Sequence, residues 1–206
     1  MEEKIFHKKL SELYTCYNTV IKPLIADIES KQQEFPDSLF NEIRAFNDHI
    51  ARCYMSDFTD DMILSEINRA ESHIIRITLD CYKYLAVWFD DYFKHFKVDF
   101  DISLIDNGEF APYFYTIQLK GRKLSKEAKS NESYDKQLSY EKYQEAYNVY
   151  SELYKKIDEI LPKIQWARKF RLNFLSIIIS AIVSGIITAI IPWSEFINWI
   201  SSLFHH

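Results

Sequence analysis

The chain has 206 residues, a formal net charge of −5, 48% hydrophobic residues and 27% charged residues. This balance can form a buried core, so it excludes a chain that is disordered throughout. Only three glycines and five prolines are present, which argues against a turn-rich all-β fold. We predict an all-α protein with a helical bundle at residues 1–166, a transmembrane helix at 167–192 and a short amphipathic tail helix at 193–206.

The first half of the chain is predicted to form three helices. The first runs from about Glu3 to Gln33, with a kink at Pro23 because proline removes a backbone donor. The second begins after Pro36, Asp37 and Ser38, and its buried stripe comprises Leu39, Ile43, Phe46, Ile50 and Cys53. The third starts with an N-cap at Thr59 and continues to about Lys97. Its apolar positions alternate three and four residues apart, in a heptad-like seam of Ile75, Thr78, Tyr82, Leu85, Phe89, Tyr92 and Phe96.

Residues 98–112 break this pattern and are predicted to form a loop with a short strand or helical turn. A weaker helix follows from Tyr113 to about Lys129, and residues 130–133 form a linker. A last helix begins near Asp135 and carries a tyrosine seam, Tyr140, Tyr143, Tyr147, Tyr150 and Tyr154. We interpret this tyrosine seam as a packing surface that pairs with another subunit, with nucleobase stacking as the alternative. The helix is expected to continue into the apolar segment, with a bend at Pro162.

The segment from Leu172 to Ile191 contains no charged residue. About 20 residues, at a rise of about 1.5 Å each, are enough to cross a hydrocarbon core. A buried helix of a soluble protein is the alternative, but such a helix normally has a wider polar face. Four basic residues precede the segment and none follows it, which predicts a cytoplasmic N-terminal domain; they are Lys163, Arg168, Lys169 and Arg171.

Beyond Pro192, apolar residues recur at helical spacing as far as Phe204. They predict a short amphipathic helix that lies on the far membrane face or packs under neighbouring subunits.

The apolar segment also carries a polar arc and a strip of small residues. At about 100° per residue, the polar side chains fall within roughly 120°: Asn173, Ser176, Ser180, Ser184 and Thr188. Beside them lie Ala181, Gly185 and Ala189, whose spacing lets helices approach closely. We predict a homo-oligomer in which the polar arc lines a pore and the small residues form helix contacts. The alternative is that the hydroxyls bond to carbonyls of their own helix.

Two groups of basic residues are candidate ligand-binding sites. The first lies on the second and third helices, where an antiparallel hairpin would gather Arg44, His49, Arg52, Arg69, His73 and Arg76. Such a cluster can bind phosphate bidentately, although a solvated face with weak ion pairs is the alternative. The second is the stretch KGRKLSKEAK, with Lys120, Arg122, Lys123 and Lys126. It suits anionic lipid or a nucleic-acid backbone, or it is an ordinary solvated helix side.

Sequence motifs for catalysis are missing: the chain contains no Gly-rich phosphate loop, HExxH, CxxC or GxSxG. The three cysteines, Cys16, Cys53 and Cys81, have no metal-binding spacing. We therefore expect neither enzymatic activity nor a cofactor or metal site.

The stretch FNEIRAFNDHIARCY, followed by a single C-terminal span, resembles the small helical membrane effectors of bacterial antiviral systems. Among these, the chain is most similar to the effector of Hailong defence. The resemblance implies a tetrameric channel in the inner membrane, held shut by an oligodeoxyadenylate that a partner nucleotidyltransferase makes. It also implies that one of the two basic groups binds a single-stranded nucleic acid, without assigning individual residues.

These observations together predict a homo-oligomeric, gated ion channel with a cytoplasmic sensor domain, whose opening dissipates ion gradients. Two alternatives remain open: a tail-anchored interaction adaptor without a pore, and a membrane-bound enzyme.

Overall fold

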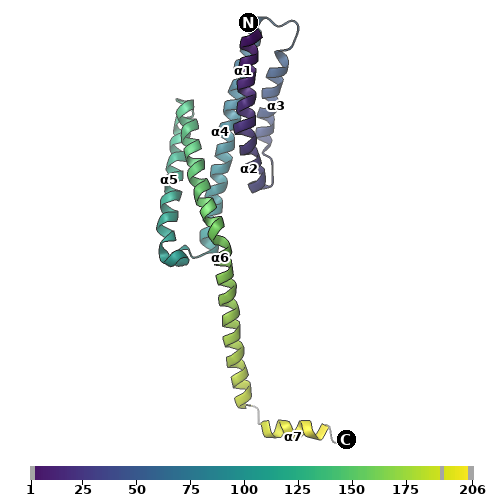
Figure 1. The fold of residues 1–206 in the computed structure, drawn as a ribbon, viewed down its shortest axis with the longest axis vertical. Helices are drawn as coiled ribbons and strands as arrows, with labels where there is room; N and C mark the ends of the chain where they lie inside the picture. The colour runs from purple at the N-terminus through teal and green to yellow at the C-terminus, as the bar shows by residue number, and fades with distance from the viewer. Residues whose placement is uncertain (1–2, 191–192, 204–206) are drawn as a thin grey trace. The chain divides into compact units, whose positions relative to one another are not determined.

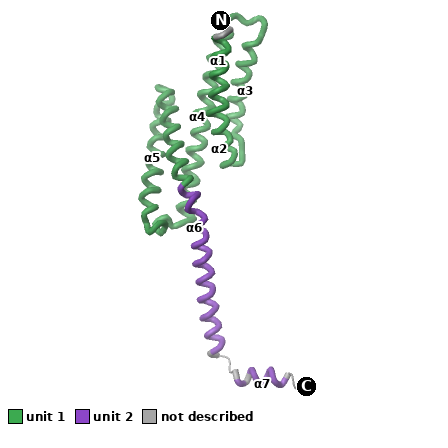
Figure 2. Tube along the Cα trace, in the orientation of Figure 1, with its two compact units in different colours: residues 1–155 green, residues 156–206 purple. Residues whose placement is uncertain are grey.

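The structure, a computed structural model, describes residues 3–190 and 193–203, and every regular element in these residues is a helix (Figure 1). The prediction of an all-α fold is therefore confirmed. The elements are α1 (Glu3–Cys16), the π-helical turn η1 (Tyr17–Ile21), α2 (Lys22–Gln32), α3 (Asp37–Arg52), α4 (Asp60–Asp99), the 3₁₀ segment η2 (Ile102–Gly108), α5 (Phe110–Asn131), α6 (Lys136–Ile190) and α7 (Trp193–Leu203). The chain divides into two compact units, residues 1–155 and 156–206 (Figure 2).

The first predicted helix is interrupted by η1. The backbone N–H of Lys22 bonds to the carbonyl of Tyr17, five residues earlier, as in a π-helix. Pro23 follows directly and cannot donate a backbone hydrogen bond, so the irregularity occurs at the position where the sequence predicts a kink. The segment ends at Gln33, whose φ of 56° is left-handed.

The helices α3 and α4 begin at the predicted signals. Pro36 precedes α3, and Thr59 caps α4, with its Oγ1 accepting a hydrogen bond from the backbone N–H of Met62 at 3.4 Å. The predicted stripe of α3 is buried at Leu39, Phe46, Ile50 and Cys53, while Ile43 is half-buried. This stripe packs against α4.

The 40-residue helix α4 is the common scaffold of the first unit. It contacts α1, α2 and α3, and also α5 (Figure 1). Because several helices cover it, its buried surface is wider than the predicted seam and includes Ile74, Ile77, Cys81 and Phe93.

The tyrosine seam of α6 packs against α4 of the same chain. Ring centroids lie 5.9 Å apart for Tyr82 and Tyr140, and 5.5 Å apart for Trp88 and Tyr154. Tyr150 is fully buried between these helices. The seam is a packing surface, as predicted, but the expected pairing with another subunit is wrong because α4 already covers it.

The segment between α4 and α5 contains the 3₁₀ segment η2, so the prediction of a loop with a helical turn is confirmed, and the strand alternative does not apply. Asp106 and Asn107 adopt left-handed φ angles of 52° and 54°. The helix α5 begins at Phe110, three residues earlier than predicted, and Phe110 contacts Phe96 of α4 with ring centroids 6.4 Å apart. The helix also extends to Asn131, into the predicted linker.

In the second unit, the apolar segment belongs to α6. This helix runs without a break from Lys136 to Ile190 and contains Pro162, so the prediction of one helix that continues into the apolar segment is confirmed. The predicted tail is helical as α7. Residues 191, 192 and 204–206, which include the predicted end of the span and Phe204, lie outside the described residues.

Helices α5 and α6 meet at Gly121. A Cβ atom at this position would lie 2.3 Å from Cε1 of Tyr150, far inside van der Waals contact. We predict that Gly121→Ala destabilises the protein by about 1–3 kcal/mol through overpacking. Thermal unfolding of the full chain in detergent measures this, as a lower midpoint temperature.

A double-mutant cycle supplies the control for Gly121→Ala. Tyr150→Leu removes the ring that the new methyl group meets, so the glycine substitution is expected to cost much less in this background. Equal costs in both backgrounds would contradict the close contact.

Candidate functional site

The apolar part of α6 is long enough and apolar enough to cross a membrane. An 18-residue window has a mean hydropathy of 2.0, and none of it is buried within the structure. The exposed fraction is 65% for Ile177 and 57% for Ile182, which point in different directions around the helix. No part of the described chain covers this surface, so a single chain leaves a large apolar surface exposed.

Side chains of the polar arc differ in their hydrogen bonds. The hydroxyl of Thr188 donates to the carbonyl of Ser184 at 2.8 Å, as the back-bonding alternative predicts. Within the part of the chain that the structure describes, the hydroxyls of Ser176, Ser180 and Ser184 have no hydrogen-bond partner. An unpaired hydroxyl is costly in hydrocarbon, so these three favour contact with water or with another helix.

Within a single chain, nothing packs against Gly185, the central residue of the predicted helix-contact strip. A Cβ atom built on Gly185 would meet nothing within 4 Å. Ala181 is exposed, and Ala189 lies in α6 but its side chain is not described. The glycine is therefore not required by packing inside the chain, which leaves close approach of another helix as a reason for it.

The structure brings together most of the first basic cluster. His49 of α3 and His73 of α4 stack with ring centroids 5.1 Å apart. The Nδ1–H of His49 donates to Glu66 at 2.6 Å, and that of His73 donates to Glu42 at the same distance.

The arginines of this cluster already have carboxylate partners. Arg52 and Arg69 lie 3.5 Å and 3.0 Å from Glu66, and Arg76 lies 4.0 Å from Glu42. Arg44 is exposed, and none of the described carboxylates lies within 4.0 Å of it. The two glutamates thus occupy the place that a bound phosphate would take. Glu42 was not among the predicted site residues, because its pairing with His73 depends on the register between α3 and α4.

Glu66 is the centre of this network, with its side chain only 8% exposed. Burial alone would raise its pKa. The hydrogen bond from His49 and the charges of His49, Arg69 and Arg52 outweigh burial, so the pKa of Glu66 lies below its ordinary value of 4.5. The network therefore holds an ionised carboxylate between α3 and α4.

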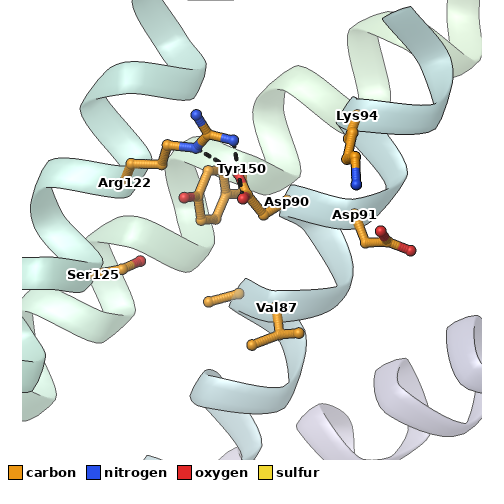
Figure 3. A pocket seen from close by; sticks show the side chains of 8 residues that line it. Val87, Asp90, Asp91, Lys94, Arg122, Ser125 and Tyr150 are labelled. Atoms are coloured by element: carbon orange, nitrogen blue, oxygen red, sulfur yellow. Dashed lines mark hydrogen bonds and ion pairs between the residues drawn. The ribbon is translucent and has the colours of Figure 1, made fainter. Parts of the chain in front are cut away.

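The second basic stretch lies on α5, and only one of its four predicted site residues has an ion-pair partner. Arg122 makes a two-point ion pair with Asp90 of α4, with distances of 2.6 Å and 2.9 Å (Figure 3). Lys120, Lys123 and Lys126 are exposed, and none of the described carboxylates lies within 4.0 Å of them. These three lysines are free to meet an anion, whereas Arg122 fastens α5 to α4.

An open pocket of about 410 Å³ lies beside this ion pair (Figure 3). Its lining comprises Ala86, Val87, Asp90, Asp91, Lys94, Arg122, Ser125 and Tyr150. Burial raises the pKa of Tyr150 to about 12, although the Ser125 hydroxyl and Arg122 act in the opposite direction. The lining contains two acidic side chains, Asp90 and Asp91, and two basic ones, Lys94 and Arg122. The pocket therefore has a formal net charge of zero and does not favour a ligand of either sign.

A second pocket, also of about 410 Å³, has Lys31 in its lining. Lys31 pairs with Asp27, and its Nζ lies 5.5 Å from the ring centroid of Trp88 and 5.2 Å from that of Tyr154. These distances suit cation–π contact, so Lys31 links α2 to α4 and α6.

Comparison with family models, with curated proteins and with solved structures finds no match to this chain. Among the described residues, no group of three or more His, Cys, Asp or Glu side chains is arranged to hold a metal ion.

The depressed pKa of Glu66 makes a pH-dependent contribution to stability. A carboxylate whose pKa is lowered by folding stabilises the protein above its unfolded-state value and loses this effect as the pH falls through the folded-state value. We predict that thermal stability declines below about pH 4.5 and that Glu66→Gln weakens this decline.

At neutral pH, Glu66→Ala is expected to cost about 2 kcal/mol, because buried charge-assisted hydrogen bonds are lost. Unfolding of the full chain in detergent at several pH values measures both effects. The matched control is Glu71→Gln, an exposed glutamate on the same helix. An equal pH response in both glutamine variants would contradict a special role of Glu66.

Proposed function

We propose that the protein is a single-pass membrane effector that associates with copies of itself into a gated ion channel, with its helical bundle as the cytoplasmic sensor. The observation that carries the proposal is the polar arc on an apolar helix that no part of the described chain covers. A monomeric anchor surrounded by lipid would leave the hydroxyls of Ser176, Ser180 and Ser184 without partners. A ring of helices would turn them towards a shared, hydrated axis.

The same arc also contains two large apolar residues. At about 100° per residue, Ile177 and Ile187 fall between the polar positions. In a pore lined by the polar arc, rings of isoleucine would alternate with rings of hydroxyls. Narrow apolar rings close a pore by excluding water, so the arc suits a channel that is shut at rest without any charged residue in the span.

The ligand of the sensor is proposed to be a single-stranded oligonucleotide, as the resemblance to Hailong effectors implies. The α5 lysines Lys120, Lys123 and Lys126 are favoured over the His49–His73 cluster. Their positive charges are exposed and lack described carboxylate partners, whereas Glu42 and Glu66 pair with Arg52, Arg69 and Arg76 and offset part of the charge of the cluster. From the same resemblance we propose a role in antiviral defence, a location in the bacterial inner membrane and an assembly of four subunits.

The proposed pore is tested by replacing two serines of the polar arc with larger, apolar residues. Ser180→Leu with Ser184→Leu removes two hydroxyl rings and adds apolar bulk, so we expect ion flux through proteoliposomes to fall at least about tenfold. The matched control is Ile179→Leu with Val183→Leu, which places leucines at the same spacing outside the arc. This control is expected to conduct like the original protein.

Insertion must be measured in both double variants by resistance to alkaline extraction. Two outcomes would refute the pore: no flux from the original protein under any condition, or equal flux in the two double variants. An inserted protein without flux would instead favour the tail-anchored adaptor.

The ligand site is tested with fluorescent single-stranded oligodeoxyadenylate and the full chain in detergent. Lys120→Gln/Lys123→Gln/Lys126→Gln is expected to weaken binding and to reduce the slope of log affinity against log salt by about two, at about 0.7 for each lost phosphate contact. The comparison variant is Arg52→Gln/Arg69→Gln/Arg76→Gln, which removes three charges from the other cluster. A larger loss in this variant would assign the ligand to the α3–α4 cluster instead.

A further inference from the structure

The basic residues before the span lack the ion pairs that several cations of the bundle make. In the bundle, Arg52, Arg69 and Arg122 each lie beside a carboxylate. The four cations before the span, Lys163, Arg168, Lys169 and Arg171, have no described carboxylate within 4.0 Å. Their counter-charges must therefore come from outside the described chain.

The four cations surround the helix instead of marking one face. At about 100° per residue they point in four directions, separated by roughly 60–120°. Along the helix axis they occupy only about 12 Å, at about 1.5 Å per residue. A protein partner contacts one side of a helix, whereas the surface of a membrane contacts all sides at one depth. The arrangement therefore fits a membrane surface.

Aromatic rings lie at the same level. Trp166 stacks on Phe170 with ring centroids 5.6 Å apart, and Phe170 stacks on Phe174 at 6.4 Å. Trp166 is 69% exposed, and indole rings favour the headgroup region of a bilayer. This ladder leads from the cations directly into the apolar segment, so the cations lie where lipid phosphates would be.

We propose that residues 163–174 form a collar that binds the headgroups of anionic phospholipids and enriches these lipids around the protein. The inference depends on the proposed membrane span, and it adds a lipid preference that the span alone does not require. Basic residues beside an anionic membrane surface each favour binding by about fivefold. The collar binds lipid headgroups, so a phosphate ion in solution would not replace them.

The test uses the full chain reconstituted in phosphatidylcholine vesicles with spin-labelled phosphatidylglycerol or spin-labelled phosphatidylcholine. The fraction of label immobilised by the protein gives the preference between the two lipids. We expect a preference of about fivefold for phosphatidylglycerol at low salt, decreasing at about 1 M salt, where screening extends over only about 3 Å.

Two variants locate the preference. Lys163→Gln/Arg168→Gln/Lys169→Gln/Arg171→Gln should abolish it, and the matched control Lys8→Gln/Lys22→Gln/Lys94→Gln/Lys136→Gln, with the same change in net charge at exposed lysines of the bundle, should keep it. A charge-conserving exchange, Lys163→Arg/Arg168→Lys/Lys169→Arg/Arg171→Lys, should also keep it. Preference that persists in the first variant, or is lost equally in the control, would overturn the proposal.

Two further outcomes separate this inference from the proposed function. If the original protein resists alkaline extraction but shows no lipid preference, the collar is wrong while the span stands. If the protein is extracted and immobilises no lipid, both are wrong. Replacing chloride by inorganic phosphate at equal ionic strength should leave the preference unchanged, and its loss would show that the cations bind free anions instead.

Discussion

An apolar helix that its own chain does not cover must be covered by something else, and residues 172–188 of α6 impose this requirement on the whole protein. The hydrophobic effect disfavours an isoleucine-rich surface in water on every side of the helix. Lipid chains would cover that surface, but they would offer no hydrogen-bond partner to the hydroxyls of Ser176, Ser180 and Ser184. A bilayer and a group of copies together satisfy both needs, which is why the membrane span and self-association belong to one proposal.

The bundle meets a different electrostatic requirement, because most of its basic side chains near helix contacts are neutralised internally. Glu66 pairs with His49, Arg52 and Arg69 and offsets part of their positive charge, and Asp90 neutralises Arg122. These pairs fix α3 and α5 on α4. The exposed α5 lysines and the collar before the span are two groups of cations that lie close together along their helices and have no described carboxylate partner, so they are the proposed places for an anionic partner to bind.

Local signals in the sequence were sufficient for most of the fold. Thr59 and Pro36 define helix starts through short-range chemistry, and the three-and-four spacing on α4 follows from helical geometry. The partner of a surface could not be predicted in this way. The spacing of the tyrosine seam was compatible with packing against another subunit or against α4. Periodicity indicates which face of a helix is buried, but it does not indicate which element buries that face. The pairing of Glu42 with His73 likewise depends on the register between α3 and α4, which becomes known only when the helices are packed.

The position of the tyrosine seam within α6 also determines at what stage of synthesis the helical bundle can be completed. Domains fold from the N-terminus during synthesis, but the aromatic residues of α4 stay uncovered until residues 140–154 leave the ribosome. The apolar segment follows in the same helix, only about twenty residues later. If the segment spans a membrane as proposed, completion of the bundle and delivery of the span to the bilayer would fall close together, and a nascent chain delayed at this stage would expose two apolar surfaces at once to chaperones and insertion factors.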